Sequence, residues 1–265
     1  MSDQTVSTKP KKEPSTSPVA GGQLPYLCDL FSRQEARELY EQIYKDVKGV
    51  KVSHEERNQK KLTDKSLIYG EACYDEFCEI LQHVQPNPGS TFYDLGSGIG
   101  KALVIAAMTV PFAKVVGAEM LEGLHAISME AVSRIKTHLS DQEKETSTQF
   151  EIHCKDLNNI SMTDADIVFI SSTCFSDSLM DRISRQCEQL KTGAKVVSLT
   201  RGIQSSQYET IEKKHIKMSW GSPTYSFKNT KAQRRHRRLR SAPHQTKTLN
   251  ENSGRSVVDD SSGSL

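Results

Sequence analysis

The residues best suited to chemistry form a glycine-rich run, Asp94-Leu95-Gly96-Ser97-Gly98-Ile99-Gly100, directly after the short segment 91–93. Because glycine has no Cβ, such a loop turns tightly and admits a ligand close to the main chain. Dinucleotide-binding loops place their third glycine one residue later, where this chain has Lys101. An acid just before the loop would also repel a pyrophosphate. The loop therefore indicates a ligand other than a dinucleotide.

Acids also follow the next two segments with strand character. Glu119 ends the segment 114–119, and Asp156 follows the segment 149–154. A carboxylate in the position of Glu119 accepts ribose hydroxyls in nucleotide-binding proteins of this topology. Asp156 could bond an adenine amino group while Leu157 covers the ring, and Asp94 would attract a cationic amino-acid group. Strand-end capping explains one such acid but three poorly, so the pattern predicts S-adenosylmethionine as cofactor.

The elements that position these residues alternate between strand and helix patterns. Helices are expected at 102–110, 121–138 and 177–190, and strands at 91–95, 114–119, 149–154, 166–170, 194–200, 211–220 and 224–229. Alternation at these lengths predicts βαβ units in a mostly parallel sheet. The predicted fold is α/β, a class I, Rossmann-like methyltransferase fold with a seven-stranded sheet and a small N-terminal helical segment.

The N-terminal segment carries two helix signals. Ser32-Arg33-Gln34-Glu35 has capping-box spacing, and apolar residues recur at helical spacing after it. A second amphipathic pattern spans 74–84 and ends at Pro86-Asn87-Pro88-Gly89. Residues 48–66 are charged and without a pattern, which predicts a mobile connection.

Composition bounds the rest of the chain. The hydrophobic fraction of the 265 residues is 35%, which predicts polar ends around one domain. We expect disordered residues 1–23, a helical segment with a cofactor-covering loop at 24–89, a methyltransferase core at 90–229, and a basic then polar tail at 230–265. No apolar run suits a membrane span. The 6 cysteines lack regular spacing, so we expect no metal site and a reducing, intracellular setting.

Several motifs resemble one family. Tyr69-Gly70-Glu71, the run from Tyr93 to Gly100, and Gly117-Ala118-Glu119 occur in the order and spacing of the family founded on the yeast disruptor of telomeric silencing. These Dot1-like proteins are histone H3 lysine methyltransferases without a SET domain. The resemblance continues through Lys155-Asp156-Leu157, the segment 170–175 and Ser219-Trp220-Gly221, and the small size resembles protist members.

The resemblance implies a role for each matching residue. The loop Tyr69, Gly70, Glu71 and Ala72 would close over the methionine end of the cofactor. The remaining cofactor residues would be Asp94, Leu95, Gly96, Ser97, Gly98, Gly100, Lys101, Glu119, Asp156 and Leu157. Phe175 and Trp220 would line a channel for the substrate lysine, although both residue types also occur in ordinary cores.

The catalytic positions depart from the family pattern. Ser172 stands where the family usually has an asparagine near the transferred methyl, and Ala72 stands where it often has a threonine. Ser172 is expected to align the amine, and Tyr225, with Phe227 as competitor, to supply the late aromatic position. A free lysine has a pKa of about 10.4, so an aromatic and apolar channel would be needed to favour the neutral amine.

A dense basic run follows the last predicted strand. Its members are Lys228, Lys231, Arg234, Arg235, Arg237, Arg238 and Arg240. Such a run is typical of a nucleic-acid contact or a nuclear-import signal, the alternative being a solvated tail. The resemblance implies a histone-lysine N-methyltransferase that acts on a lysine in the core of histone H3, and with the basic run we expect it to be nuclear and to contact nucleosomal DNA. The alternatives are a nucleic-acid methyltransferase and a catalytically weak chromatin-binding protein.

Overall fold

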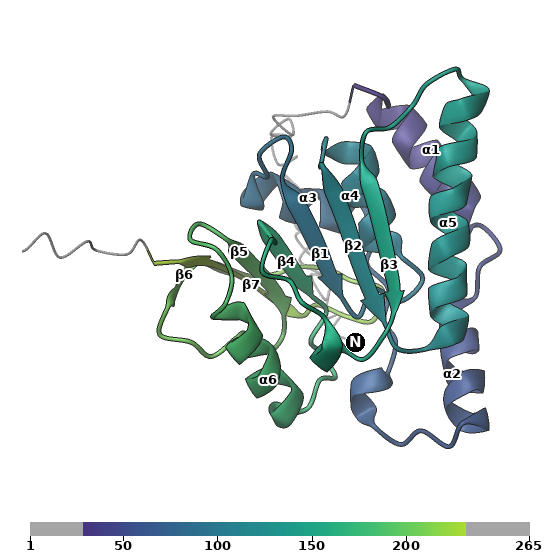
Figure 1. The fold of residues 1–265 in the computed structure, drawn as a ribbon. Coiled ribbons are helices and arrows are strands. Elements are labelled where there is room, and N and C mark those ends of the chain that lie inside the picture. The colour runs from purple at the N-terminus through teal and green to yellow at the C-terminus, as the bar shows by residue number, and fades with distance from the viewer. Residues whose placement is uncertain (1–28, 232–265) are drawn as a thin grey trace, which may run out of the picture. The chain divides into compact units, whose positions relative to one another are not determined.

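A computed structural model describes residues 29–231. The predicted tail at 1–23 lies outside this range, as does the predicted tail at 230–265 apart from its first two residues, of which Thr230 ends the last strand. One seven-stranded sheet runs through the described part in the order β3-β2-β1-β4-β5-β7-β6 (Figure 1). The strands are β1 Thr91–Leu95, β2 Lys114–Glu119, β3 Gln149–Cys154, β4 Ile167–Ile170, β5 Lys195–Leu199, β6 Tyr208–His215 and β7 Thr224–Thr230. β1 to β5 pair in parallel, and β7 is antiparallel to β5 and β6. The predicted Rossmann-like fold is confirmed.

Helices cover both faces of the sheet. They are α1 Arg33–Tyr44, α2 Gly49–Gln59, α3 Tyr74–Val84, α4 Lys101–Thr109, α5 Glu122–Asp141 and α6 Asp177–Cys187, with short 3-10 turns η1 Lys65–Leu67 and η2 Leu157–Asn159. Alternate strand residues join different cores: Phe92 packs with the α1, α3, α4 and α5 side, and Tyr93 packs with α6. In Figure 1, α3 and α4 lie behind the sheet. No described helix has the length and apolar composition of a membrane span.

The start of α1 confirms the predicted capping box. The Ser32 hydroxyl accepts from the Glu35 N–H at 3.1 Å, and the Ser32 N–H donates to the Glu35 carboxylate at 2.8 Å. Two backbone donors at the helix start are thereby satisfied, which fixes where α1 begins.

The prediction of a mobile connection at 48–66 is wrong, because α2 and η1 lie within it. The α2 sequence gave little apolar signal, since only Gly49 and Ser53 are buried. The helix is anchored by charge instead. The Glu56 carboxylate accepts from the N–H groups of Glu122 and Gly123, at 2.9 and 2.8 Å. A carboxylate at the positive end of the α5 dipole is stabilising.

The sixth strand is also displaced from its predicted position, 211–220. β6 ends at His215, and a turn with an isolated Met218–Gly221 bridge follows. β6 lies at the edge of the sheet, with a register shift between Thr210 and Glu212. The register shift and the exposure of the strand weaken the alternation of apolar and polar residues from which a strand is predicted. As a result, Trp220 lies in a turn rather than a strand.

We expect Glu56→Ala to lower the stability of the protein by about 1 kcal/mol, the usual loss for a helix cap. Thermal unfolding would measure it. The matched control is Glu55→Ala, since exposed Glu55 contacts only Lys51 across 3.6 Å among the described ion pairs, and this change should stay within about 0.5 kcal/mol. Equal stability of the two variants would contradict a capping role for Glu56.

Candidate active site

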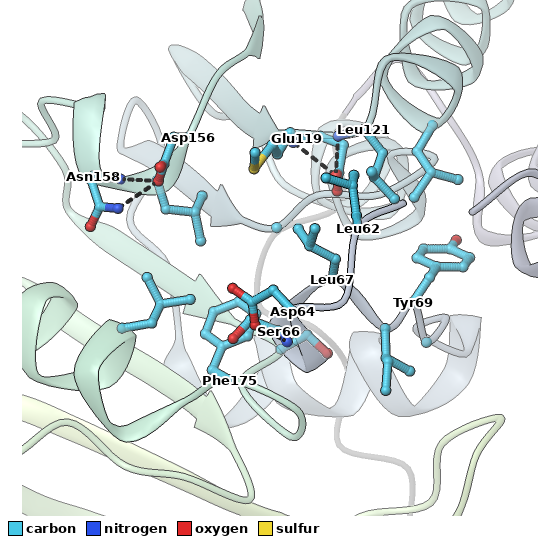
Figure 2. Close-up of a pocket in the computed structure, with 18 of the residues that line it drawn as sticks. Leu62, Asp64, Ser66, Leu67, Tyr69, Glu119, Leu121, Asp156, Asn158 and Phe175 are labelled. Atoms are coloured by element: carbon cyan, nitrogen blue, oxygen red, sulfur yellow. Dashed lines mark hydrogen bonds between the residues drawn. The ribbon is translucent and has the colours of Figure 1, made fainter. Parts of the chain in front are cut away.

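A cavity of about 420 Å³ opens at the carboxyl ends of the parallel strands. Its walls come from residues 61–64 and 66–70, from Gly96 after β1, from Glu119 at the end of β2, from Asp156 after β3 and from Phe175 after β4. Figure 2 shows Leu67, Tyr69, Glu119, Asp156 and Phe175 around a common space. Ligands of open parallel sheets bind at this edge. The structure therefore brings the acids predicted after β2 and β3 to one cavity.

A second, much smaller cavity of about 20 Å³ adjoins the first. Asp94, Lys101 and Trp220 line it, together with Ala72 and Ser97. Four lining residues belong to both cavities, namely Tyr69, Gly70, Gly96 and Ser171. The two spaces are thus parts of one site, and Asp94 lies in its smaller part, next to the glycine loop.

The glycine loop has positions at which a Cβ atom would not fit. Gly96 and Gly98 have φ of 82° and 55°, a region that favours glycine. A Cβ on Gly98 would overlap the Tyr69 ring, and one on Gly96 would lie 3.3 Å from the Phe175 ring. The covering loop and the segment after β4 therefore both rest on the glycine loop, one on each glycine.

The covering loop is held in place by residues from three distant segments. The Lys101 ammonium lies 2.6 Å from the Glu71 carboxylate and 5.3 Å from the centre of the Tyr44 ring. The Tyr44 hydroxyl donates to the carbonyl oxygen of Ile99 at 3.1 Å. The Ser219 hydroxyl donates to the Glu71 carbonyl at 3.0 Å. Glu71 and Lys101, both predicted to bind cofactor, here contact each other.

Glu119 joins the glycine loop to the start of α5. One oxygen accepts from the N–H groups of Met120 and Leu121, both at 2.8 Å, and the other accepts from the Gly98 N–H at 2.9 Å (Figure 2 shows the contact with Leu121). Burial raises its pKa, and these three bonds oppose the shift. Glu119 also lines the larger cavity, and an oxygen with one donor retains capacity to accept from a ligand hydroxyl.

Asp94 is almost fully buried, with 3% of its surface exposed. Its Oδ1 has no hydrogen-bond partner among residues 29–231, and neither does the hydroxyl of Ser97. Burial, and then the charge of Glu119, raise the pKa of Asp94 to about 8. A buried acid without a partner is costly, so this position is suited to receive a cation or a hydrogen-bond donor.

Asp156 lines the larger cavity beside Leu157. Its Oδ1 accepts from the backbone N–H and the side-chain amide of Asn158, at 2.9 and 2.8 Å (Figure 2). These bonds cap η2 and direct the carboxylate and the Leu157 side chain to the same wall. The local turn thus supplies a polar group and an apolar face together.

Ser172 and Tyr225, predicted as catalytic, line neither cavity. Ser172 is fully buried, and its hydroxyl lies 2.7 Å from the carbonyl oxygens of Leu199 and Arg201. Tyr225 is fully buried in the core, with its ring 6.2 Å from that of His83. Their predicted roles at the amine therefore do not fit the geometry, because Ser171 lines the cavities instead and Tyr225 packs in the core that α3 shares with the sheet.

The first two members of the basic run belong to the fold. The Lys228 ammonium donates to the Ile203 carbonyl at 2.7 Å, and the Lys231 ammonium donates to the Ser206 carbonyl at 2.7 Å. Burial, and then the charge of Lys213, lower the pKa of Lys228. Each ammonium keeps further N–H donors, so a phosphate contact by Lys228 or Lys231 stays a prediction. The other members, Arg234, Arg235, Arg237, Arg238 and Arg240, lie outside the described residues.

The sequence did not indicate two parts of the site. Residues 61–64 and 66–68 form one wall of the larger cavity, although the part up to residue 66 was predicted to be a mobile connection. Arg201 contacts the segment after β4 through its guanidinium, which donates to the Phe175 carbonyl at 2.9 Å. The only local signal for Arg201 was its place directly after a predicted strand. Among residues 29–231, no cluster of His, Cys, Asp or Glu is arranged for a metal ion.

Comparison with solved structures defines the fold. The fold is similar to that of TrmN from Thermus thermophilus, with a TM-score of 0.50 and 15% identity over 63% of this chain and 51% of that one. A putative RNA methyltransferase from Pyrococcus horikoshii gives a TM-score of 0.50 and 12% identity over 77% and 100% of the two chains. At these identities the likeness concerns the fold alone. The fold is that of class I methyltransferases.

A family model narrows the class. Residues 50–229 match the model described as the histone methylation protein DOT1, and this chain belongs to that family. A Candida albicans protein named "Histone-lysine N-methyltransferase, H3 lysine-79 specific" is 27% identical over 54% of this chain and 11% of its own length. A Caenorhabditis elegans protein of the same name is 28% identical over 50% and 15%. The chain thus matches only a minor part of each of these relatives.

We expect Gly98→Ala to displace the Tyr69 ring and reduce affinity for an adenosine-containing ligand by at least tenfold, or about 1.4 kcal/mol. The reason is that the added methyl occupies the place of the ring. Calorimetric titration with S-adenosylhomocysteine would measure the loss. Gly193→Ala is the matched control, since Gly193 also has a positive φ, 89°, but an added Cβ there meets nothing within 4 Å. Equal affinities of the two variants would contradict the contact.

Proposed function

We propose that this chain is an S-adenosylmethionine-dependent histone-lysine N-methyltransferase, acting on a lysine in the globular core of histone H3 on nucleosomes. The names of its DOT1 relatives support the substrate. The observation that carries the cofactor is Asp94, a buried acid next to the glycine loop whose Oδ1 has no hydrogen-bond partner among residues 29–231.

The residues present fit S-adenosylmethionine. Asp94 would receive the amino group of the methionine end, and Glu119 would accept a ribose hydroxyl through the capacity that its backbone bonds leave. Asp156 would accept from the adenine amino group, with Leu157 against the ring. A site of alternating acid and apolar surface suits a molecule with a cationic end, a sugar and an aromatic base.

The protein has mainly to orient an in-line displacement. S-adenosylmethionine, when bound, supplies a methyl group already activated by its sulfonium. Phe175 and Trp220 line the site on the side of the segment after β4 and the turn after β6. Their surfaces would disfavour the charged form of an entering lysine, which lowers its pKa and favours the neutral nucleophile. The Ser171 hydroxyl, at the junction of the two cavities, would orient the amine in place of Ser172.

A nuclear location and contact with nucleosomal DNA form part of the same proposal. The histone methylation family supports an association with chromatin. The basic residues from Arg234 to Arg240 would contact DNA phosphates, while Lys228 and Lys231 stabilise β7. Binding through phosphates weakens steeply as salt concentration rises.

We expect radiolabelled methyl groups from S-adenosylmethionine to appear on histone H3 when nucleosomes are supplied. The acceptors to be compared are nucleosomes, free histones, DNA and RNA, with labelled products resolved by gel and mass spectrometry. Label on nucleic acid alone would show a nucleic-acid methyltransferase. Nucleosome binding without label on any acceptor would show a chromatin-binding protein.

We expect Asp94→Asn to stabilise the ligand-free protein above pH 8 and to weaken binding of S-adenosylhomocysteine. The folded pKa of Asp94, about 8, lies above its unfolded value of about 3.9. The stability from its protonated form is therefore complete below pH 4 and is lost as pH rises through 8. Thermal unfolding between pH 5 and 9, with calorimetry, would measure both effects. A wild-type stability that does not fall over this range would contradict the burial of an ionisable Asp94.

A further inference from the structure

The backbone reverses sharply at the end of β5. Thr200 has φ of 67°, and the N–H of Arg201 donates to the Leu199 carbonyl at 2.8 Å. A bond across two residues with positive φ at the central one is a γ-turn of the rare, strained type. Threonine is branched at Cβ, so this conformation is unusual for it. Strain of this kind persists only where the surroundings impose it, and it concentrates at functional sites.

The surrounding contacts all tie this turn to neighbouring segments. The Thr200 N–H donates to the Thr224 carbonyl at 2.6 Å, and its hydroxyl lies 3.0 Å from that of Thr173. The buried Ser172 hydroxyl lies 2.7 Å from the carbonyls on both sides of the turn, those of Leu199 and Arg201. The turn after β5 and the segment after β4 are therefore one fixed unit.

The reversal directs Arg201 back over the segment after β4. Its guanidinium donates to the Phe175 carbonyl at 2.9 Å and forms an ion pair with Asp177 at the start of α6. The Phe175 ring lies against Gly96 and lines the larger cavity. Arg201 itself lines neither cavity. Its guanidinium therefore acts on the site indirectly, and its hydrogen bond to Phe175 is the contact with a residue of the cavity wall.

We propose that Arg201, aimed by the γ-turn at Thr200, is a positioning residue that holds Phe175 against the glycine loop and so fixes the wall beside which the methyl group is transferred. This role rests on the proposed function. The planar guanidinium can donate to the carbonyl and the carboxylate at once, which a single ammonium does with less directional control. Because reacting groups must be held within fractions of an ångström, a shifted wall slows transfer.

The first test compares Arg201→Ala, Arg201→Lys and the control Arg185→Ala. Arg185 is an exposed arginine of α6, and its side chain makes no hydrogen bond or ion pair among residues 29–231. We expect Arg201→Ala to lower turnover at saturating S-adenosylmethionine by about tenfold to a hundredfold, with a smaller change in the Michaelis constant. Arg201→Lys should recover part of the turnover, and Arg185→Ala should match the wild type.

The second variant, Thr200→Gly, separates positioning from stability. Glycine adopts positive φ without strain, so the melting temperature should be retained or raised. Because glycine has wider conformational freedom, the backbone would no longer fix the direction of the Arg201 side chain, so turnover should still fall. A merely structural role predicts that turnover follows the melting temperature in every variant, and that outcome would overturn the proposal.

A spectroscopic readout tests the geometry without the reaction. The chain has 8 phenylalanines, and after labelling with 4-fluorophenylalanine the Phe175 resonance can be assigned by its loss in Phe175→Leu. We expect this fluorine resonance to shift or broaden in Arg201→Ala and not in Arg185→Ala. An unchanged resonance would overturn the positioning role. If the resonance changes in Arg201→Ala but the wild-type protein transfers no methyl group, the proposed function would be overturned and the contact between Arg201 and Phe175 would stand.

Discussion

The site depends on one buried carboxylate, that of Glu119. Its two oxygens collect backbone N–H groups from Gly98 in the glycine loop and from Met120 and Leu121 before α5. These groups come from the ends of two neighbouring strands, and those of Gly98 and Leu121 would otherwise be buried donors without a partner. The carboxylate therefore fixes the glycine loop relative to β2, and other parts of the site are built on that loop.

The second constraint is that some acids of the site have hydrogen-bond partners within the protein and one does not. Glu119, Asp156 and Glu71 are engaged with backbone or side-chain partners, whereas Asp94 is buried with an unpartnered oxygen. Engaged acids shape the cavity, while the unengaged acid raises the energy of the ligand-free protein. This contrast separates residues that build the site from the residue best placed to hold a ligand.

The covering loop shows how segments distant in sequence share one task. Tyr69 rests on Gly98, Glu71 pairs with Lys101, and Gly70 lies against Trp220, so closely that an added Cβ would approach the indole to 2.8 Å. α2 begins beside the loop at Gly49, where an added Cβ would lie 2.7 Å from the Tyr69 ring. The loop is thus held by close packing from several elements rather than by its own sequence.

The sequence by itself determined the alternation of strands and helices, the glycine loop and the acids at successive strand ends, because these follow from local periodicity and from parallel topology. The tertiary structure decided which groups face the cavity. Ser171 rather than Ser172 lines it, since the Ser172 hydroxyl bonds to carbonyls at the end of β5. The tertiary structure also decided that residues 48–66 fold into α2 and η1. The hydrogen bonds of Glu56 to the start of α5 anchor α2, and no apolar pattern does so. Such contacts join residues far apart in the chain, so no local pattern records them.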